Sequence, residues 1–80
     1  MNSAILELVG SVRNPFPSKK RKKIIEFSGK TSIKTILLEN GFLETELEFL
    51  IPIANGKRTS HDYILQDKDH IWISLPIGGG

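Results

Sequence analysis

The chain has 80 residues, a formal net charge of +2 and no cysteine. This length suits one small domain, and the missing thiols exclude disulfides and cysteine-based metal or redox sites. Apolar residues make up 39% and charged residues 25% of the chain, values typical of a folded, soluble domain. A domain of this size buries only roughly 60% of its unfolded surface, so we expect no deep active site.

Three features of the first part of the chain predict a hairpin with a long connection. Residues 5–12 alternate between two faces, as a strand does. Two prolines make 13–18 a loop, because proline lacks the N–H that a strand ladder needs. A basic run, Lys19–Lys23, then leads into a second strand over 24–27.

One amphipathic helix is predicted next. Ile33, Ile36 and Leu37 recur at the i, i+3, i+4 spacing that places side chains on one helix face. Thr31-Ser32 supplies a helix N-cap before them, and Asn40-Gly41 supplies a C-cap pair after them.

The remaining residues predict further strands. Residues 47–54 are rich in strand formers, and Pro52 among them indicates an edge position or a bulge. Asn55-Gly56 is a strong hairpin signal. Residues 67–69 read as a turn, and 71–75 alternate as the last strand.

The order of a hairpin, one helix and more strands predicts an α+β fold of the β-grasp (ubiquitin-like) type. We expect a mixed four- to five-stranded sheet with one main helix packed on one face, because one helix then covers one sheet with few residues. Residues 1–77 are predicted to form this domain. Residues 78–80 are predicted to be a flexible tail, since glycine reaches backbone conformations closed to other residues.

Several short motifs have simpler explanations than catalysis or metal binding. Ser60-His61-Asp62 has the letters of a catalytic triad, but adjacent residues in an extended chain point to opposite faces. Gly29-Lys30-Thr31 lacks the earlier glycine of a phosphate-binding loop. His61 and His70 have no cysteine or carboxylate cluster around them, so we predict no metal site. We interpret Lys19–Lys23 as solvated charges; an acidic partner surface is the alternative, and we do not expect nucleic acid binding.

The carboxyl end resembles a known family. The segment from Asp69 to Gly80 (DHIWISLPIGGG) is similar to the end of the ubiquitin-like sulfur carriers, which include the small subunit of molybdopterin synthase and the sulfur carrier of thiamin synthesis. Pro76 is similar to the molybdopterin type, and the triple glycine to the thiamin type. Lys68 departs from the pattern, because the family has glycine between the two aspartates. A left-handed lysine costs energy, so the turn is expected to differ.

This resemblance implies a stoichiometric carrier and not an enzyme. A partner enzyme would use Mg-ATP to adenylate the carboxylate of Gly80, and sulfur would then convert it to a thiocarboxylate. The resemblance implies that the carrier binds no cofactor, and that it delivers the sulfur to an acceptor synthase in molybdopterin or thiamin synthesis or in tRNA thiolation. Gly78 and Gly79 would supply a slim tail.

Five residues before the glycines are candidate partner contacts. Leu75, Pro76 and Ile77 would position the tail. Trp72 is out of phase with its two isoleucine neighbours, so we predict that it lies on the sheet face away from the helix, where Ser74 would join it.

Two other functions stay open at this stage. A protein modifier would join the same activated Gly80 to lysines of target proteins. A simple binding module would need no free carboxyl end. The N-terminal residues 1–4 lack the basic start and apolar run of a secretory signal, and no apolar run is long enough to span a bilayer. We therefore expect a cytoplasmic protein that does not bind membranes.

Overall fold

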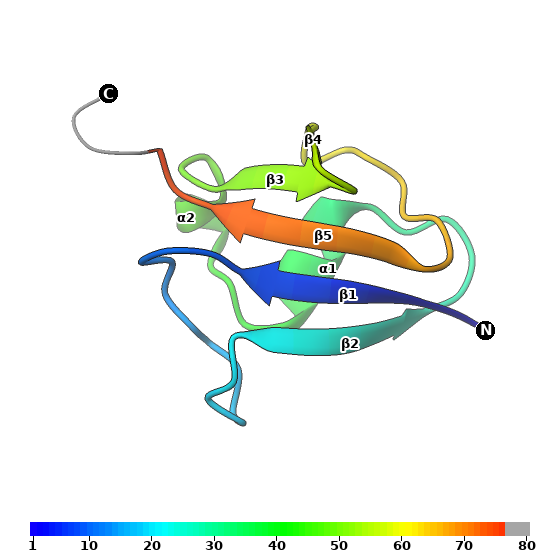
Figure 1. Ribbon diagram of the computed structural model, residues 1–80, viewed down its shortest axis with the longest axis horizontal. Coiled ribbons are helices and arrows are strands. Elements are labelled where there is room, and N and C mark those ends of the chain that lie inside the picture. The colour runs from blue at the N-terminus through cyan, green and yellow to red at the C-terminus, as the bar shows by residue number, and fades with distance from the viewer. Residues whose placement is uncertain (77–80) are drawn as a thin grey trace.

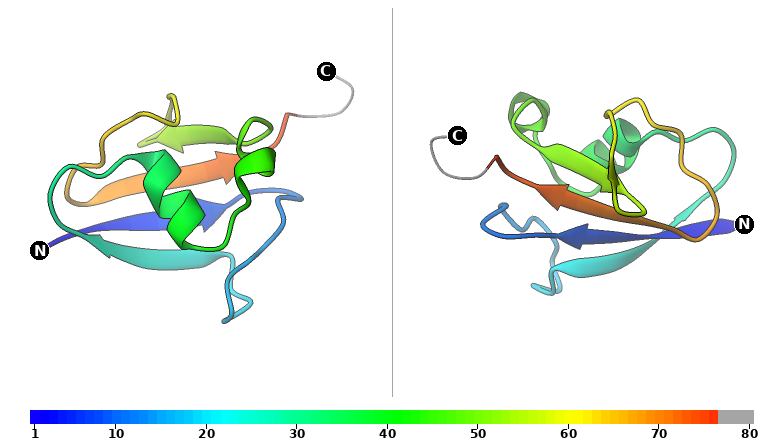
Figure 2. Two further views of the ribbon diagram at one scale, coloured as in Figure 1. Left: turned by 180° about the vertical axis from the view of Figure 1, so that it is seen from behind. Right: turned by 45° about the horizontal axis from the view of Figure 1, so that its top comes forward.

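The computed structural model describes residues 1–76. Its strands form one five-stranded mixed sheet in the order β2-β1-β5-β3-β4, with two short helices on one face (Figures 1 and 2). The predicted α+β layout, a mixed sheet with one main helix on one face, is confirmed. In chain order the elements are β1 (Asn2–Leu8), β2 (Lys22–Phe27), α1 (Ile33–Glu39), α2 (Glu44–Leu47), β3 (Ile51–Ala54), β4 (Lys57–Arg58) and β5 (Asp69–Ser74).

The last strand lies at the centre of the sheet. β5 pairs in parallel with β1 and antiparallel with β3, while β2 and β4 form the two edges. Because β1 and β5 run in the same direction, the carboxyl end of β5 leaves the sheet beside the end of β1 (Figure 1). The loop between β1 and β2 lies at this same end of the molecule.

Helix α1 forms as the sequence predicts. Ser32 is its N-cap, and the Ser32 hydroxyl accepts a hydrogen bond from the Thr35 N–H. Asn40 is the C-cap, followed by Gly41 with φ +99°. A Cβ on Gly41 would lie 2.9 Å from Cβ of Pro15, so both backbone conformation and space require glycine here. The predicted apolar stripe of the helix is fully buried.

The predicted strand over 47–54 is wrong in its first half. Residues 44–47 form helix α2, and the Leu50 N–H donates to the Leu47 carbonyl in the turn that follows. Leu47 and Leu50 are both buried, because three residues of a helical turn bring them to the same side. Packing therefore overrides the strand propensity of residues 47–50, and β3 begins only at Ile51.

The bounds of the first strand differ from the prediction, and the predicted edge position of Pro52 is wrong. The first strand starts at Asn2 and ends at Leu8, because Gly10 adopts a left-handed φ of +68° and turns the chain. Pro52 lies one strand in from the edge, since the two-residue β4 flanks β3. The Pro52 carbonyl accepts from the Thr59 N–H, just past the end of β4.

The Asn55-Gly56 hairpin is confirmed, with φ of +53° and +86°, as a type I′ turn requires.

The core lies between the sheet and the helices. Its most deeply buried side chains come from β1, α1 and β5, with Val12 from the loop after β1: Leu6, Val12, Ile33, Ile36, Leu37, Ile71 and Ile73. No helix within residues 1–76 is long and apolar enough to cross a membrane.

Candidate functional site

The site begins where β5 ends. The Ile73 carbonyl accepts a hydrogen bond from the Val9 N–H at 2.9 Å, and Ser74 pairs with Ile51. Both neighbouring strands therefore fix the chain up to this point. Leu75 packs against the core, and Pro76 is exposed. Ile77, a predicted partner contact, and the predicted tail residues Gly78, Gly79 and Gly80 lie outside the described residues.

Trp72 and Ser74 lie on the sheet face that no helix covers. Alternate residues of β5 are buried, and Trp72 and Ser74 are the half-buried residues between them. The prediction that Trp72 faces away from the helix is confirmed. Ile53 is its partner on β3, so the two residues form an apolar area beside the end of β5.

His70 connects this area to β1. Its ring stacks on the Trp72 indole, with centroids 4.0 Å apart. Its Nε2 lies 2.7 Å from Oε1 of Glu7. We call the surface formed by Glu7, Ile53, His70, Trp72 and Ser74 the open face; Figure 1 views the sheet from this side. Trp72 and Ser74 were predicted from the strand phase, whereas the other three were not.

A buried carboxylate holds the turn that begins β5. Asp69 is only 5% exposed and accepts from the Asn55 amide, the Tyr63 hydroxyl and the Gln66 N–H, each at 2.8 Å. Burial alone raises the pKa of Asp69, but the three hydrogen bonds outweigh it and leave that pKa below its ordinary value. Burial and the Asp69 carboxylate together raise the pKa of Tyr63.

The predicted difference in this turn is not found. Lys68 adopts the left-handed conformation, with φ +71°. Its N–H donates to the Ser3 carbonyl at 2.6 Å, and the Asp67 side chain accepts from the Ser3 N–H at 2.9 Å. These contacts with β1 offset the cost of a left-handed lysine.

This network predicts acid sensitivity. The pKa of Asp69 is lower in the folded than in the unfolded chain, so its stabilising effect is present above the unfolded pKa of about 4 and is lost as pH falls through the folded pKa. The free energy of unfolding, measured in urea, should therefore decrease below about pH 4. Asp69→Asn should be less stable at pH 7 and should lose less stability on acidification. Parallel pH profiles for the two proteins would contradict this role.

Two residues of the basic run, Arg21 and Lys23, form hydrogen bonds within the domain. The Arg21 guanidinium donates to the carbonyls of Gly10 and Val12 at 2.8 Å. The Lys23 ammonium donates to the Asn40 side chain at 2.7 Å. Solvated charge is thus only part of the explanation. A groove of about 600 Å³ lies between the basic residues and β1. It is lined by Ile5, Glu7, Lys20, Arg21, Lys22, Lys23 and Ile24.

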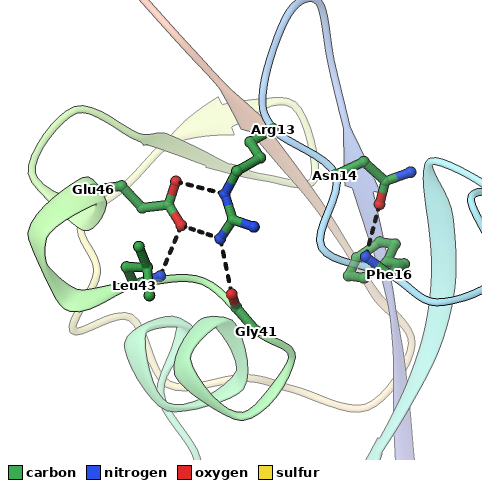
Figure 3. Close-up of polar contacts among 6 residues, drawn as sticks. All are labelled: Arg13, Asn14, Phe16, Gly41, Leu43 and Glu46. Atoms are coloured by element: carbon green, nitrogen blue, oxygen red, sulfur yellow. Dashed lines mark hydrogen bonds and ion pairs between the residues drawn. The ribbon is translucent and has the colours of Figure 1, made fainter.

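An ion pair between Arg13 and Glu46 fixes the loop after β1, near the end of β5 (Figure 3). Both oxygens of Glu46 accept from the Arg13 guanidinium, which also donates to the Gly41 carbonyl. The same carboxylate accepts from the Leu43 N–H, and the Arg13 hydrogen bond lowers the pKa of Glu46. The sequence did not predict this pair, because its members are 33 residues apart.

Within the described chain, no group of three histidine, cysteine or acidic side chains lies close enough to hold a metal ion. Nε2 of His61 is buried without a hydrogen-bond partner, so Ser60, His61 and Asp62 do not form the hydrogen-bonded arrangement of a catalytic triad. The candidate functional site is therefore the end of β5 together with the open face.

No family model and no curated protein matches this sequence. Solved structures do match. A molybdopterin converting factor subunit 1 from Pyrococcus furiosus superimposes with a TM-score of 0.73 at 13% identity, covering 96% of this chain and 100% of that one. Small archaeal modifier protein 1 from Haloferax volcanii matches with a TM-score of 0.74 at 10% identity, with the same coverage. Urm1 from Trypanosoma brucei matches at 0.66 and 16%, covering 99% and 96%.

These likenesses establish the fold. The chain has the β-grasp (ubiquitin-like) fold, and its likeness to these solved structures extends over nearly all of the chain. At 10 to 16% identity the match is one of architecture.

Proposed function

We propose that this chain is a sulfur carrier whose reacting group is the carboxylate of Gly80. The observation that carries the proposal is the position of β5: a central strand, bonded on both sides, leads directly into Leu75-Pro76 and then the glycines. A rigid domain thereby presents a slim segment to another protein's active site. The neighbour from Pyrococcus furiosus, named as a molybdopterin converting factor subunit, supports this function.

The chemistry needs an activating partner, because a carboxylate is a poor electrophile. An oxygen of the Gly80 carboxylate attacks the α-phosphorus of ATP, pyrophosphate leaves, and an acyl-adenylate forms. Sulfide then attacks the carbonyl carbon and AMP leaves, which produces a thiocarboxylate. The partner enzyme supplies Mg-ATP, so the carrier itself binds no cofactor and acts once per activation. A synthase would then accept the sulfur, in the cytoplasm.

Each proposed site residue has a physical task. Gly78 and Gly79 have no side chains, so the tail fits a narrow channel. Leu75 holds the base of the tail to the core, and Pro76 limits the directions the tail can take. Ile77 would contact the partner.

The open face is the proposed docking surface for that partner. Tryptophan is enriched among residues that dominate binding energy, and Trp72 lies three residues before Leu75 on a fixed strand. Trp72→Ala should weaken binding to the activating enzyme by about tenfold to a hundredfold, which corresponds to a loss of roughly 1.4 to 2.8 kcal/mol. Titration calorimetry of the two purified proteins measures this. Thr59→Ala, on the β4 side, is the control, and unchanged affinity of Trp72→Ala would exclude the open face.

A protein modifier is the second candidate. The matching protein from Haloferax volcanii is named as a modifier, and the same acyl-adenylate at Gly80 can be attacked by a lysine amine of a target protein. The products distinguish the two functions. Extracts containing the tagged chain would show ladders of conjugates for a modifier, whereas a carrier would accumulate as the free thiocarboxylate.

A further inference from the structure

The outer edge of β2 is an unpaired strand edge. β2 is the first strand in the sheet order and pairs only with β1 among residues 1–76. The Leu8 N–H donates to the Arg21 carbonyl at 2.7 Å, and bonded pairs alternate along an antiparallel ladder. Lys22, Ile24 and Glu26 therefore direct their N–H and C=O groups away from β1, where another strand can pair with them.

The side chains of these three residues form an amphipathic row. They alternate along the strand, so they share one face of the sheet. Ile24 is 70% exposed, which is unusual for a large apolar side chain in the middle of a strand. Within the described chain, neither Lys22 nor Glu26 has an ion-pair partner. Ile24 and Lys22 also line the 600 Å³ groove beside β1.

We propose that this edge binds a second copy of the chain. The two β2 strands pair antiparallel about a two-fold axis at Ile24. Ile24 then lies opposite Ile24 of the second copy, and Lys22 lies opposite Glu26 of the second copy on both sides of the axis. The two five-stranded sheets join into one continuous sheet.

Three properties of the edge agree on this register. The outward-facing backbone groups of residues 22, 24 and 26 meet one another, which antiparallel bonding requires. The charges pair with opposite sign twice, and opposite charges on facing strands stabilise a sheet. The two exposed isoleucines cover each other. Symmetric registers centred on residue 22 or 26 would place Lys22 against Lys22 or Glu26 against Glu26, and like charges disfavour both. Registers centred on residue 23 or 25 would place Ile24 opposite Lys22 or Glu26, so the two exposed isoleucines would not face each other.

The pairing leaves the proposed carrier site free. The carboxyl end of β5 and the start of β2 lie at the same end of the strands. A two-fold axis across β2 therefore sends the two carboxyl ends to opposite ends of the joined sheet. The interface involves one short strand from each copy, so the dimer belongs to the weak, reversible class.

The first test is sedimentation velocity on the purified chain over a wide concentration range. The wild type should show a concentration-dependent monomer–dimer equilibrium. Lys22→Glu and Glu26→Lys should each weaken it by about tenfold, because each creates two like-charge pairs. The double variant exchanges the charges and should restore the wild-type dissociation constant. A chain that stays monomeric, or a double variant no better than the single ones, overturns the proposal.

The second test uses the absence of cysteine in the chain. In the proposed register, residue 24 faces itself at a Cα separation of about 5.5 Å, within the range of a disulfide. Ile24→Cys should therefore crosslink rapidly under mild oxidation. Lys22→Cys is the matched control, because residue 22 lies about 14 Å from its own copy in this register. Equal crosslinking of the two variants would contradict the proposed register.

Both tests use the protein without ATP, sulfur or an activating enzyme, so they are independent of the proposed function. Circular dichroism confirms that each variant is folded, and the exchanged charges all lie on an exposed strand edge.

Discussion

Gly79→Val is expected to abolish adenylation while leaving the domain folded. A branched side chain in the segment that enters the partner's channel displaces Gly80 from the α-phosphate of ATP, and a displacement of about 1 Å at a reacting centre costs about a hundredfold in rate. Residue 79 follows the last residues of the sheet and core, Ser74 and Leu75, so stability should not change. Pyrophosphate release in the presence of the activating enzyme measures the rate.

Two controls separate channel fit from general damage. Ser28→Val adds the same side chain on an exposed residue that follows the far end of β2 and should react like the wild type. Gly79→Ala should give an intermediate rate, because one methyl group is smaller than the isopropyl group. If Gly79→Val were adenylated at the normal rate, the glycine tail would not be the segment that enters the partner.

Ile71→Ala has the largest expected effect on stability. Ile71 is fully buried in β5 and pairs with Leu6 and Ala54 on its two neighbouring strands. Removing such a side chain costs about 2 to 5 kcal/mol, whereas a domain of this size has a total stability of only about 4 to 12 kcal/mol. Urea unfolding followed by circular dichroism should show a midpoint shifted to much lower denaturant.

The chain contains a matched control for this substitution. Ile24→Ala removes the same atoms from a residue that is 70% exposed, so it should change the free energy of unfolding by less than about 0.5 kcal/mol. The measurement is made at low protein concentration, where self-association does not contribute. Equal losses at residues 24 and 71 would mean that the core has been placed wrongly.

Local patterns predicted much of this fold. The apolar stripe of α1, its caps and the Asn55-Gly56 hairpin depend on neighbouring residues, so the sequence contains the whole signal. The phase of β5 likewise placed Trp72 on the open face. Helix α2 was missed because Glu44–Leu47 is a single turn, too short for a periodic pattern, and it runs directly into the strand-forming residues up to Ala54. The burial of Leu47 and Leu50 against the rest of the core decides for a helical turn there.

The polar contacts of the site could not be predicted in the same way. Asp69 draws its partners from positions up to 14 residues away, and Arg13 reaches Glu46 across 33 residues. No periodic pattern connects such residues. Lys68 is a further example. Lysine disfavours the left-handed conformation, as the sequence analysis assumed, but contacts between its turn and β1 hold it in that conformation.

The most direct test of the proposed function is the intact mass of the chain after incubation with ATP, sulfide and an activating enzyme of this class from the same organism. Half of each sample is treated with a thiol-alkylating reagent. Because the chain has no cysteine, alkylation reports a thiocarboxylate and no other group. The carrier function predicts replacement of one oxygen by sulfur and subsequent alkylation. An unchanged mass, with an enzyme proven active on another carrier, would contradict it.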